Sequence, residues 1–234
     1  MLLGRKTIGT VAYMGGVMSL PEPFVHSWSQ MLEYNSEYLL NPDERIDYNR
    51  ATVSYHSFAR NMLVEHMKGD WLLQLDTDIT FEPDILARML LKMEQLGIDV
   101  LVGMYLYKSE PHPPMLYGWN KKTKSKFMIG DWDREADIIP VWGAGGGCLL
   151  VRRKVYDTIK AKLGCSPFDI YTDKDGSPHS EDHSFFQRCW DLKIPVYAHQ
   201  DIWVNHLAYK ELNPHKDYQR PDPSEIDIVD PLKH

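Results

Sequence analysis

The sequence predicts an α/β protein built on a mostly parallel central sheet. Apolar runs of strand length occur at 71–75 and 98–105, and a helical pattern at 84–96 lies between them. Strand, helix and strand in this spacing are typical of a parallel crossover. The chain has 234 residues, of which 43% are hydrophobic and 25% charged. That length and composition suit one domain with a sizeable core, flanked by helices.

The amino-terminal segment predicts a strand, a turn and a helix. Residues 6–14, KTIGTVAYM, have the β-branched and apolar character of a first strand, and Gly15 and Gly16 follow directly. Glycine at this position lets the backbone turn tightly and approach a ligand. A helix is predicted over about 20–35, where apolar residues recur at helical spacing.

The next segment predicts a short strand around 45–48 and a helix over 50–67. The apolar stripe of this helix includes Val53 and Leu63, and Gly69–Asp70 marks its end. Arg60 lies on the same helix. An arginine there could clamp a diphosphate through two parallel hydrogen bonds, but an ordinary surface arginine fits the pattern equally well.

The strand at 71–75 ends in two carboxylates, Asp76 and Asp78, which are separated by Thr77. The carboxyl ends of strands in open α/β sheets are where ligands bind. Two acids this close repel each other unless a cation, a shared proton or water relieves them, and Mg²⁺ and Mn²⁺ favour oxygen ligands. The pattern indicates a candidate metal site. The alternative is a solvated turn before the helix that starts at 82–84.

The middle of the chain predicts hairpins and a glycine-rich turn. Residues 108–140 have the prolines, lysines and short alternating runs expected of hairpins that stand off the main sheet. Four glycines then occur within 143–147, between Trp142 and an apolar strand. We interpret this turn as backbone left open to a ligand rather than as a flexible joint. A helix is predicted over 154–163.

The carboxyl-terminal part predicts a helix, two strands and a tail. Ser180 is the predicted N-cap of a helix whose first turn contains Glu181 and Asp182, where acids compensate the helix dipole. Short strands are predicted at 194–198 and 202–206, the second ending in His206. We assign 1–210 to the domain and 211–234 to a Pro-rich acidic tail that is loosely ordered or folds over the body.

Composition excludes several classes of function. The formal net charge of −7 gives no general attraction to nucleic acid or anionic membranes, although the lysines within 121–126 form one local basic cluster in what we interpret as a loop. The three cysteines are odd in number and widely spaced, which argues against a disulfide framework and favours a reducing, cytoplasmic setting. No apolar run has the length of a signal peptide core or a membrane span.

The order of these motifs resembles the GT-A glycosyltransferases, in particular family-2-type bacterial and phage enzymes. The resemblance covers about residues 6–208 and depends on the ordered set of motifs rather than on any one of them. It implies a single Rossmann-like domain that binds a nucleoside-diphosphate sugar, such as a UDP- or GDP-sugar, together with Mn²⁺ or Mg²⁺.

The resemblance also implies roles for individual residues. Asp78 and His206 would bind the metal, and Asp76, with Thr77 beside it, would contact the ribose or the water shell of the metal. Asp182, next to Glu181, matches the position of the catalytic base in inverting members. The remaining implied contacts are Ala12, Tyr13 and Met14 in the nucleotide pocket, Arg60 near the diphosphate or base, and Trp142, Gly145 and Gly146 facing the donor sugar and acceptor.

The implied reaction moves one sugar to an acceptor hydroxyl, with Asp182 accepting its proton. If configuration is retained, Asp182 would position the acceptor instead. There is no Gln-x-x-Arg-Trp motif after Glu181–Asp182, which favours single transfer over polymer synthesis. The acceptor is left open between a glycan, a small molecule and a modified DNA base, for which the lysines at 121–126 would be the contact. The oligomeric state is also left open.

Two other readings remain at the sequence level. Asp76-x-Asp78-x-Thr80 also fits the nucleophile motif of haloacid-dehalogenase-type phosphatases, in which the first aspartate is phosphorylated. That class usually has this strand nearer its amino terminus. A non-catalytic module that binds a sugar nucleotide is the second alternative.

Overall fold

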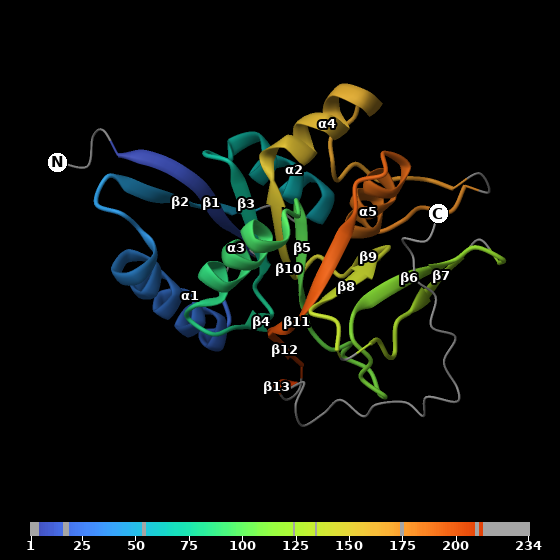
Figure 1. Cartoon of the computed structure of the whole chain (residues 1–234), viewed down its shortest axis with the longest axis horizontal. Coiled ribbons are helices and arrows are strands. Elements are labelled where there is room, and N and C mark those ends of the chain that lie inside the picture. Colours follow the sequence, from blue (N-terminus) through green and yellow to red (C-terminus); the bar gives the residue numbers. More distant parts are fainter. Residues whose placement is uncertain are drawn as a thin grey trace.

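The computed structural model of the protein describes residues 5–15, 19–52, 55–123, 125–133, 135–173 and 176–208, and the backbone of 211–212. At its centre is a seven-stranded sheet in the order β2-β1-β3-β10-β5-β11-β8 (Figure 1). Its strands are β1 (Lys6–Met14), β2 (Glu44–Ala51), β3 (Trp71–Asp76), β5 (Val100–Met104), β8 (Ile138–Val141), β10 (Cys148–Arg152) and β11 (Val196–Trp203).

Most strands of this sheet share one direction. β1 is parallel to β2 and to β3, and β11 is parallel to β5. β10 runs antiparallel to both β3 and β5, so these two also share a direction, and only β8 and β10 are reversed. The expected mostly parallel α/β sheet is confirmed.

Helices cover both faces of the sheet because its strands are apolar on both faces. α1 (Glu22–Tyr34), which continues into the π-helical turn η1 (Asn35–Leu39), and α3 (Ile85–Leu96) cover one face. α2 (His56–His66), α4 (Arg153–Leu163) and α5 (Glu181–Asp191) cover the other. Neighbouring residues of β3 show the alternation: Leu73 packs with α1 and α3, and Leu72 packs with α2 and α4.

Two small antiparallel sheets lie beside the main one (Figure 1). The first contains β6 (Leu116–Asn120), β7 (Ser125–Met128) and β9 (Gly143–Ala144). The second contains β4 (Ile79–Thr80), β12 (Asn205–Leu207) and β13 (Glu211–Leu212). The second sheet joins the segment after Asp78 to a strand near residue 206, which lies far away in the sequence.

The structure corrects several details of the predicted elements. β3 and β5 share a direction, but β10 lies between them, because the turn at 143–147 returns the chain antiparallel beside β3. β8 joins the edge of the main sheet instead of standing off it. The strands predicted at 194–198 and 202–206 are the continuous β11 followed by β12. α2 begins at His56, later than predicted, because β2 extends to Ala51.

Some predictions lie on residues outside those the structure describes. These are the features assigned to Gly16, Val53 and Lys124, and most of the tail predicted at 211–234. Within the described residues, no helix is long and apolar enough to cross a membrane.

Candidate active site

The two aspartates lie at the carboxyl edge of the sheet, at the join between β3 and β4. Asp76 is the last residue of β3, and its backbone N–H donates to the carbonyl of Gly147 at 2.9 Å. Asp78 comes two residues later, immediately before β4, and its carbonyl accepts from the N–H of Leu207 at 2.7 Å. Thr77 lies half-buried in the turn between them. Backbone pairing on both sides therefore holds the Asp-x-Asp turn in place.

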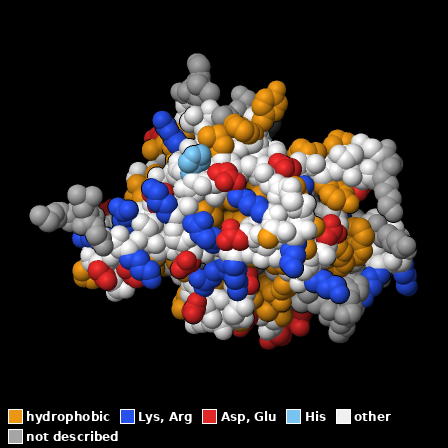
Figure 2. Space-filling view, turned by 90° about the horizontal axis from the view of Figure 1, so that it is seen from above, with side chains coloured by type: hydrophobic (Ala, Val, Ile, Leu, Met, Phe, Trp, Pro, Cys, Tyr) orange, Lys and Arg blue, Asp and Glu red, His pale blue; other side chains and the backbone are white. Residues whose placement is uncertain are grey.

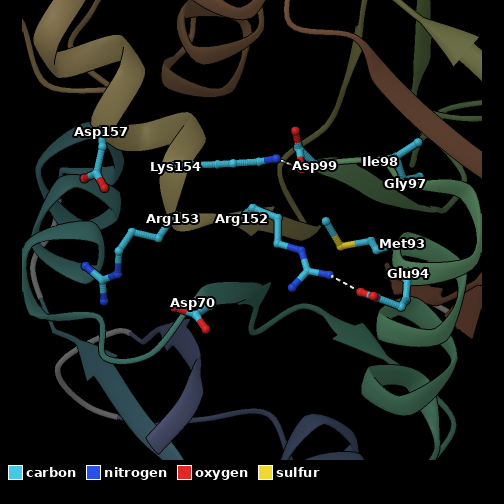
Figure 3. Close-up of a pocket in the computed structure, with 10 residues that line it drawn as sticks. All are labelled: Asp70, Met93, Glu94, Gly97, Ile98, Asp99, Arg152, Arg153, Lys154 and Asp157. Atoms are coloured by element: carbon cyan, nitrogen blue, oxygen red, sulfur yellow. Dashed lines mark hydrogen bonds and ion pairs between the residues drawn. The ribbon is translucent and has the colours of Figure 1, made fainter.

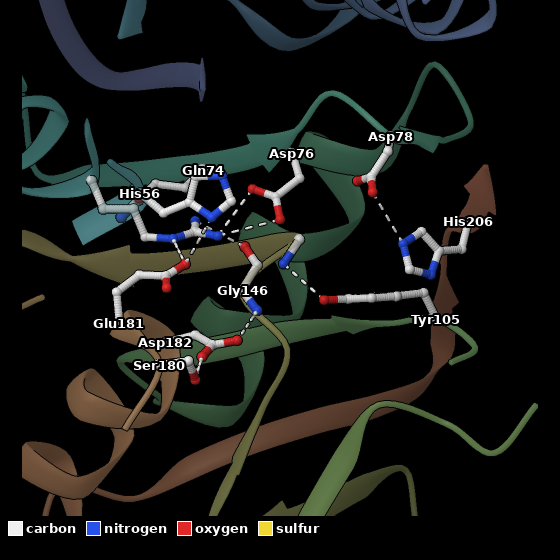
Figure 4. Close-up of polar contacts among 12 residues, drawn as sticks. His56, Gln74, Asp76, Asp78, Tyr105, Gly146, Ser180, Glu181, Asp182 and His206 are labelled. Carbon is white, nitrogen blue, oxygen red and sulfur yellow. Dashed lines mark hydrogen bonds and ion pairs between the residues drawn. The ribbon is translucent and has the colours of Figure 1, made fainter. Parts of the chain in front are cut away.

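His206 reaches this turn through β12, where it pairs with Ile79 of β4. Its Nδ1 lies 2.7 Å from the carbonyl oxygen of Leu106. A carbonyl can only accept, so Nδ1 carries a proton and donates to Leu106, which leaves Nε2 directed at Asp78. Nε2 lies 3.3 Å from Oδ2 of Asp78 (Figure 4). The expected meeting of these two distant residues is confirmed as geometry.

Lys108, which the sequence analysis did not single out, contacts the same carboxylate. Its Nζ donates to Oδ2 of Asp78 at 2.6 Å, and both side chains are 43% exposed. Partial burial pushes the pKa of Asp78 upward, but the hydrogen bonds from His206 and Lys108 outweigh it and lower the pKa of Asp78. Lys108 follows β5, whose carboxyl end lies at the same sheet edge as Asp76. Its position just after a predicted strand was the feature of the sequence that could have placed it at the site.

Asp76 has a different partner. Arg60 on α2 donates from Nη2 to both carboxylate oxygens of Asp76, at 2.9 and 3.3 Å. Its Nε donates to Oε1 of Glu181 at 3.3 Å, and its Nη1 donates to the carbonyl of Gly146 at 3.1 Å. Burial raises the pKa of Asp76, while Arg60 opposes that shift. Burial would lower the pKa of Arg60, but Asp76 and Glu181 more than offset it and raise the pKa.

These contacts change the expected roles of Arg60 and Asp76. Only 2% of the Arg60 side chain is exposed, and each of its three nitrogens donates to a protein oxygen. In this arrangement Arg60 lies beneath the sheet edge and does not reach out to a diphosphate. Asp76 is held by Arg60, whereas Asp78 is the aspartate beside His206.

The glycine-rich turn is also placed differently from the prediction. Residues 141–150 are all buried. A Cβ atom on Gly145 would lie 2.1 Å from the hydroxyl oxygen of Tyr105, and one on Gly146 would lie 2.6 Å from Nη2 of Arg60. Trp142 is 1% exposed and stacks on Trp119. The glycines therefore admit the protein's own side chains, and Trp142, Gly145 and Gly146 do not face an open donor site.

Glu181 and Asp182 begin α5 but point to different partners. Glu181 contacts Arg60, and its Oε1 lies 3.8 Å from Nδ1 of His56. Asp182 accepts from the N–H of Gly146 at 3.2 Å, from the N–H of His183 at 2.7 Å and from the Ser180 hydroxyl. Ser180 is the N-cap residue as predicted, but its hydroxyl contacts Asp182 instead of capping a helix N–H. Gly146 thus links Arg60 to Asp182.

The first strand contributes less side-chain surface than expected. Ala12 is fully buried, so its side chain cannot line a pocket. Tyr13 packs edge-on against Phe24 and Trp28, with ring centroids 5.4 and 4.9 Å apart. Met14 lies opposite Asp76 in the pairing of β1 with β3 and is partly buried. Tyr13 and Met14 remain the first-strand side chains near the sheet edge.

A hollow lies at the opposite edge of the sheet from Asp76 and Asp78. Its volume is about 550 Å³, and its lining includes Asp70, Asp99 and Arg153, which lie near the amino ends of β3, β5 and α4 (Figure 3). Two of its basic side chains pair with acidic ones: Arg152 with Glu94 at 2.8 Å and Lys154 with Asp99 at 2.8 Å. Basic and acidic side chains are likewise interspersed over the face in Figure 2. This hollow is not part of the candidate active site.

The pair of Asp78 and His206 fits a divalent cation. Carboxylate oxygen and neutral imidazole nitrogen both suit Mn²⁺, and a histidine ligand typically donates its other ring N–H to a carbonyl, as His206 does to Leu106. Within the described residues, no group of three or more His, Cys, Asp or Glu side chains could hold a metal. A cation here would therefore take most of its ligands from a bound molecule and water.

The fold and this sheet edge define a GT-A glycosyltransferase domain. The structure of A197 from STIV matches with a TM-score of 0.55 and 21% identity, over 96% of this chain and 98% of that one. The structure of GalNAc-T7 with UDP, GalNAc and Mn²⁺ matches with a TM-score of 0.56 and 10% identity, over 97% of this chain and 46% of that one. At these identities the matches show the fold.

The sequence places the chain within a family. Residues 29–160, more than half of the chain, match the model of Glycosyl transferase family 2, and the protein belongs to that family. It is therefore a glycosyltransferase that uses a nucleotide-sugar donor. No curated protein matches the sequence.

Proposed function

We propose that the protein transfers a single sugar from a nucleoside-diphosphate sugar to an acceptor hydroxyl in a reaction that depends on Mn²⁺ or Mg²⁺. The observation that carries this proposal is the approach of His206 Nε2 to Asp78 Oδ2 at 3.3 Å. Two adjacent ligand atoms at this separation suit neighbouring positions around one cation. The carbonyl of Leu106 fixes the imidazole so that Nε2 faces the carboxylate.

In this proposal the cation would stabilise the charge that develops on the departing nucleoside diphosphate. Lys108 extends toward the same carboxylate from the end of β5 and would supply a second positive charge beside the diphosphate. Tyr13 and Met14 would lie on the nucleotide side of the site. These side chains do not distinguish UDP from GDP, so the proposal includes both nucleotides.

Asp182 is the proposed base, and the reaction is proposed to invert configuration. The N–H groups of Gly146 and His183 and the hydroxyl of Ser180 orient its carboxylate. A carboxylate within hydrogen-bond reach of the acceptor hydroxyl can take its proton as the new bond forms. Glu181 acts differently, because it holds Arg60, which in turn holds Gly146 and Asp76.

The phosphatase alternative loses its support. The family match makes the protein a glycosyltransferase. In addition, Asp76, which would be the phosphorylated aspartate, is paired through both carboxylate oxygens with the buried Arg60. A nucleophile needs a free lone pair, which this pairing opposes.

Nucleotide binding tests the metal site directly. Thermal unfolding would be followed with UDP, GDP and their sugars, with and without Mn²⁺, because a ligand that binds the native state raises Tm. We expect metal-dependent stabilisation by at least one nucleotide in the native protein. Asp78→Asn and His206→Gln should weaken that binding about tenfold or more, as loss of a metal ligand or its support does.

A matched control is Asp201→Asn, which alters an exposed aspartate near another histidine, His199, and should leave binding unchanged. Stabilisation that needs no metal and survives both site variants would contradict the metal proposal. Metal-dependent binding without hydrolysis or transfer to any acceptor would instead favour the non-catalytic binding module.

A further inference from the structure

A lysine on the β6–β7 hairpin lies half-buried among neutral partners. Lys126 Nζ is 3.3 Å from Nδ1 of His183 and 3.5 Å from Nδ1 of His179. It also lies over the ring of Trp142, 4.9 Å from the centroid. Nε2 of His179 lies 2.8 Å from Asp173, so that nitrogen carries the proton and Nδ1 offers a lone pair to the lysine.

The charge of Lys126 has no carboxylate in direct contact within the described part of the chain. Its partners are two imidazole lone pairs and an aromatic face. Burial lowers the pKa of Lys126, and Asp173 and Asp182 oppose this shift only at longer range. A half-buried ammonium without an adjacent counter-charge is costly, and such groups gather at binding sites.

This cluster adjoins the proposed base. His183 directly follows Asp182 on α5, and its ring packs edge-on against Tyr117 and Trp142, with centroids 4.6 and 5.5 Å apart. Burial raises the pKa of Tyr117, and Asp182 adds to that shift, so the Tyr117 hydroxyl also lies in the field of Asp182. Lys126 is therefore linked through His183 to the residue that follows the proposed base in the sequence.

We propose that Lys126, which His179 and His183 position, forms an oxyanion subsite for the acceptor, which accordingly carries a phosphate or carboxylate group near the hydroxyl that receives the sugar. Both anions accept charge-assisted hydrogen bonds from a lysine ammonium. This inference rests on the proposed role of Asp182. An arriving anion supplies the counter-charge that Lys126 lacks. The half-buried ring of Tyr117 forms the apolar side of the subsite, and the buried ring of Trp142 lies beneath Lys126.

The test measures binding of methyl phosphate and of acetate to the full chain by isothermal titration calorimetry. UDP and Mg²⁺ are present throughout, so that the probe does not occupy the diphosphate site. We expect at least one probe to bind, and Lys126→Met to weaken that binding at least tenfold. The stronger of the two probes identifies the anion as phosphate or carboxylate.

The matched control is Lys122→Met, which removes an exposed lysine from the same hairpin and should leave binding unchanged. Lys126→Arg should restore part of the affinity, which a merely misfolded hairpin would not. Absence of binding to the native protein, or equal losses in both lysine variants, would overturn the proposal. Asp78→Asn separates the two proposals, because it should weaken metal-dependent UDP binding about tenfold or more and, with UDP raised to saturate the variant, leave probe binding intact.

Discussion

Asp76 and Asp78 are separated by one residue, yet their surroundings have little in common. Asp76, with 27% of its side chain exposed, contacts Arg60, which is 2% exposed and also holds Glu181 and Gly146. Asp78 faces outward with 43% of its side chain exposed, and its partners are His206 and the equally exposed Lys108. The end of β3 separates them, because residues at i and i+2 share a face only while the strand continues, and β3 ends at Asp76.

The difference in exposure suggests different roles for the two aspartates, one structural and one in ligand binding. A buried ion pair is expensive to break, because removal of one partner leaves the other charge uncompensated. An exposed ion pair contributes little and can be replaced by another cation at small cost. We therefore propose that the Arg60 network holds the sheet edge in shape and that Asp78, with His206 and Lys108, binds the ligand.

The largest expected effect comes from breaking the ion pairs of the buried Arg60. Arg60→Met leaves Asp76 and Glu181 without their shared cation, and we expect a loss of about 3 kcal/mol in the free energy of unfolding. Urea denaturation of the variant and the native protein measures it. The matched control is Arg152→Met, whose arginine pairs with the 79%-exposed Glu94 and should change stability by less than about 1 kcal/mol. Equal effects of the two substitutions would contradict the assignment.

A smaller effect is expected from removing the exposed ion pair between Lys108 and Asp78. Lys108→Met removes an ammonium that occupies the same oxygen of Asp78 as the proposed metal. An exposed pair contributes up to about 1 kcal/mol, so Mn²⁺ without nucleotide should bind about two- to fivefold more tightly to the variant. Titration calorimetry with Mn²⁺ measures this. Because Lys108 is also proposed to face the diphosphate, UDP should bind more weakly to the variant; unchanged affinities for both would remove Lys108 from the site.

The smallest expected effect is on the free energy of unfolding at acidic pH. The folded-state pKa of Asp78 is lowered by His206 and Lys108, so its contribution is present above the unfolded pKa of about 3.9 and is lost as pH falls below it. Unfolding measured at pH 5 and pH 3 should show the native protein losing more stability than Asp78→Asn. Because the side chain is exposed, the difference should stay below about 1 kcal/mol. A difference that is constant with pH would argue against a perturbed Asp78.

The fold class could be predicted because strand and helix periods are local properties of the sequence. The bounds of β1, for example, coincide with the predicted 6–14. The position of β10 between β3 and β5 could not be predicted, because buried strands of either direction read as the same apolar run. Contacts between elements decide strand order, and these are not visible in a single strand.

Some residues of the candidate site could likewise be predicted from the sequence, and others could not. Asp78, His206 and Asp182 stand out because each polar residue lies at the end of an apolar run or in the first turn of a helix. The glycine-rich turn was misinterpreted because space left by a missing Cβ looks the same in sequence whether a ligand or a protein side chain fills it. Here Tyr105 and Arg60 fill it. Lys108 was missed because a lysine among the prolines of a loop has no periodic pattern around it.

The pairing of β12 with β4 sets an order of events during synthesis. Asp78 leaves the ribosome more than a hundred residues before His206, and the two meet only through a strand of three residues. A nascent chain can form much of its central sheet before His206 is available to pair with Asp78. The proposed metal site would therefore be complete only after residue 206 has been translated.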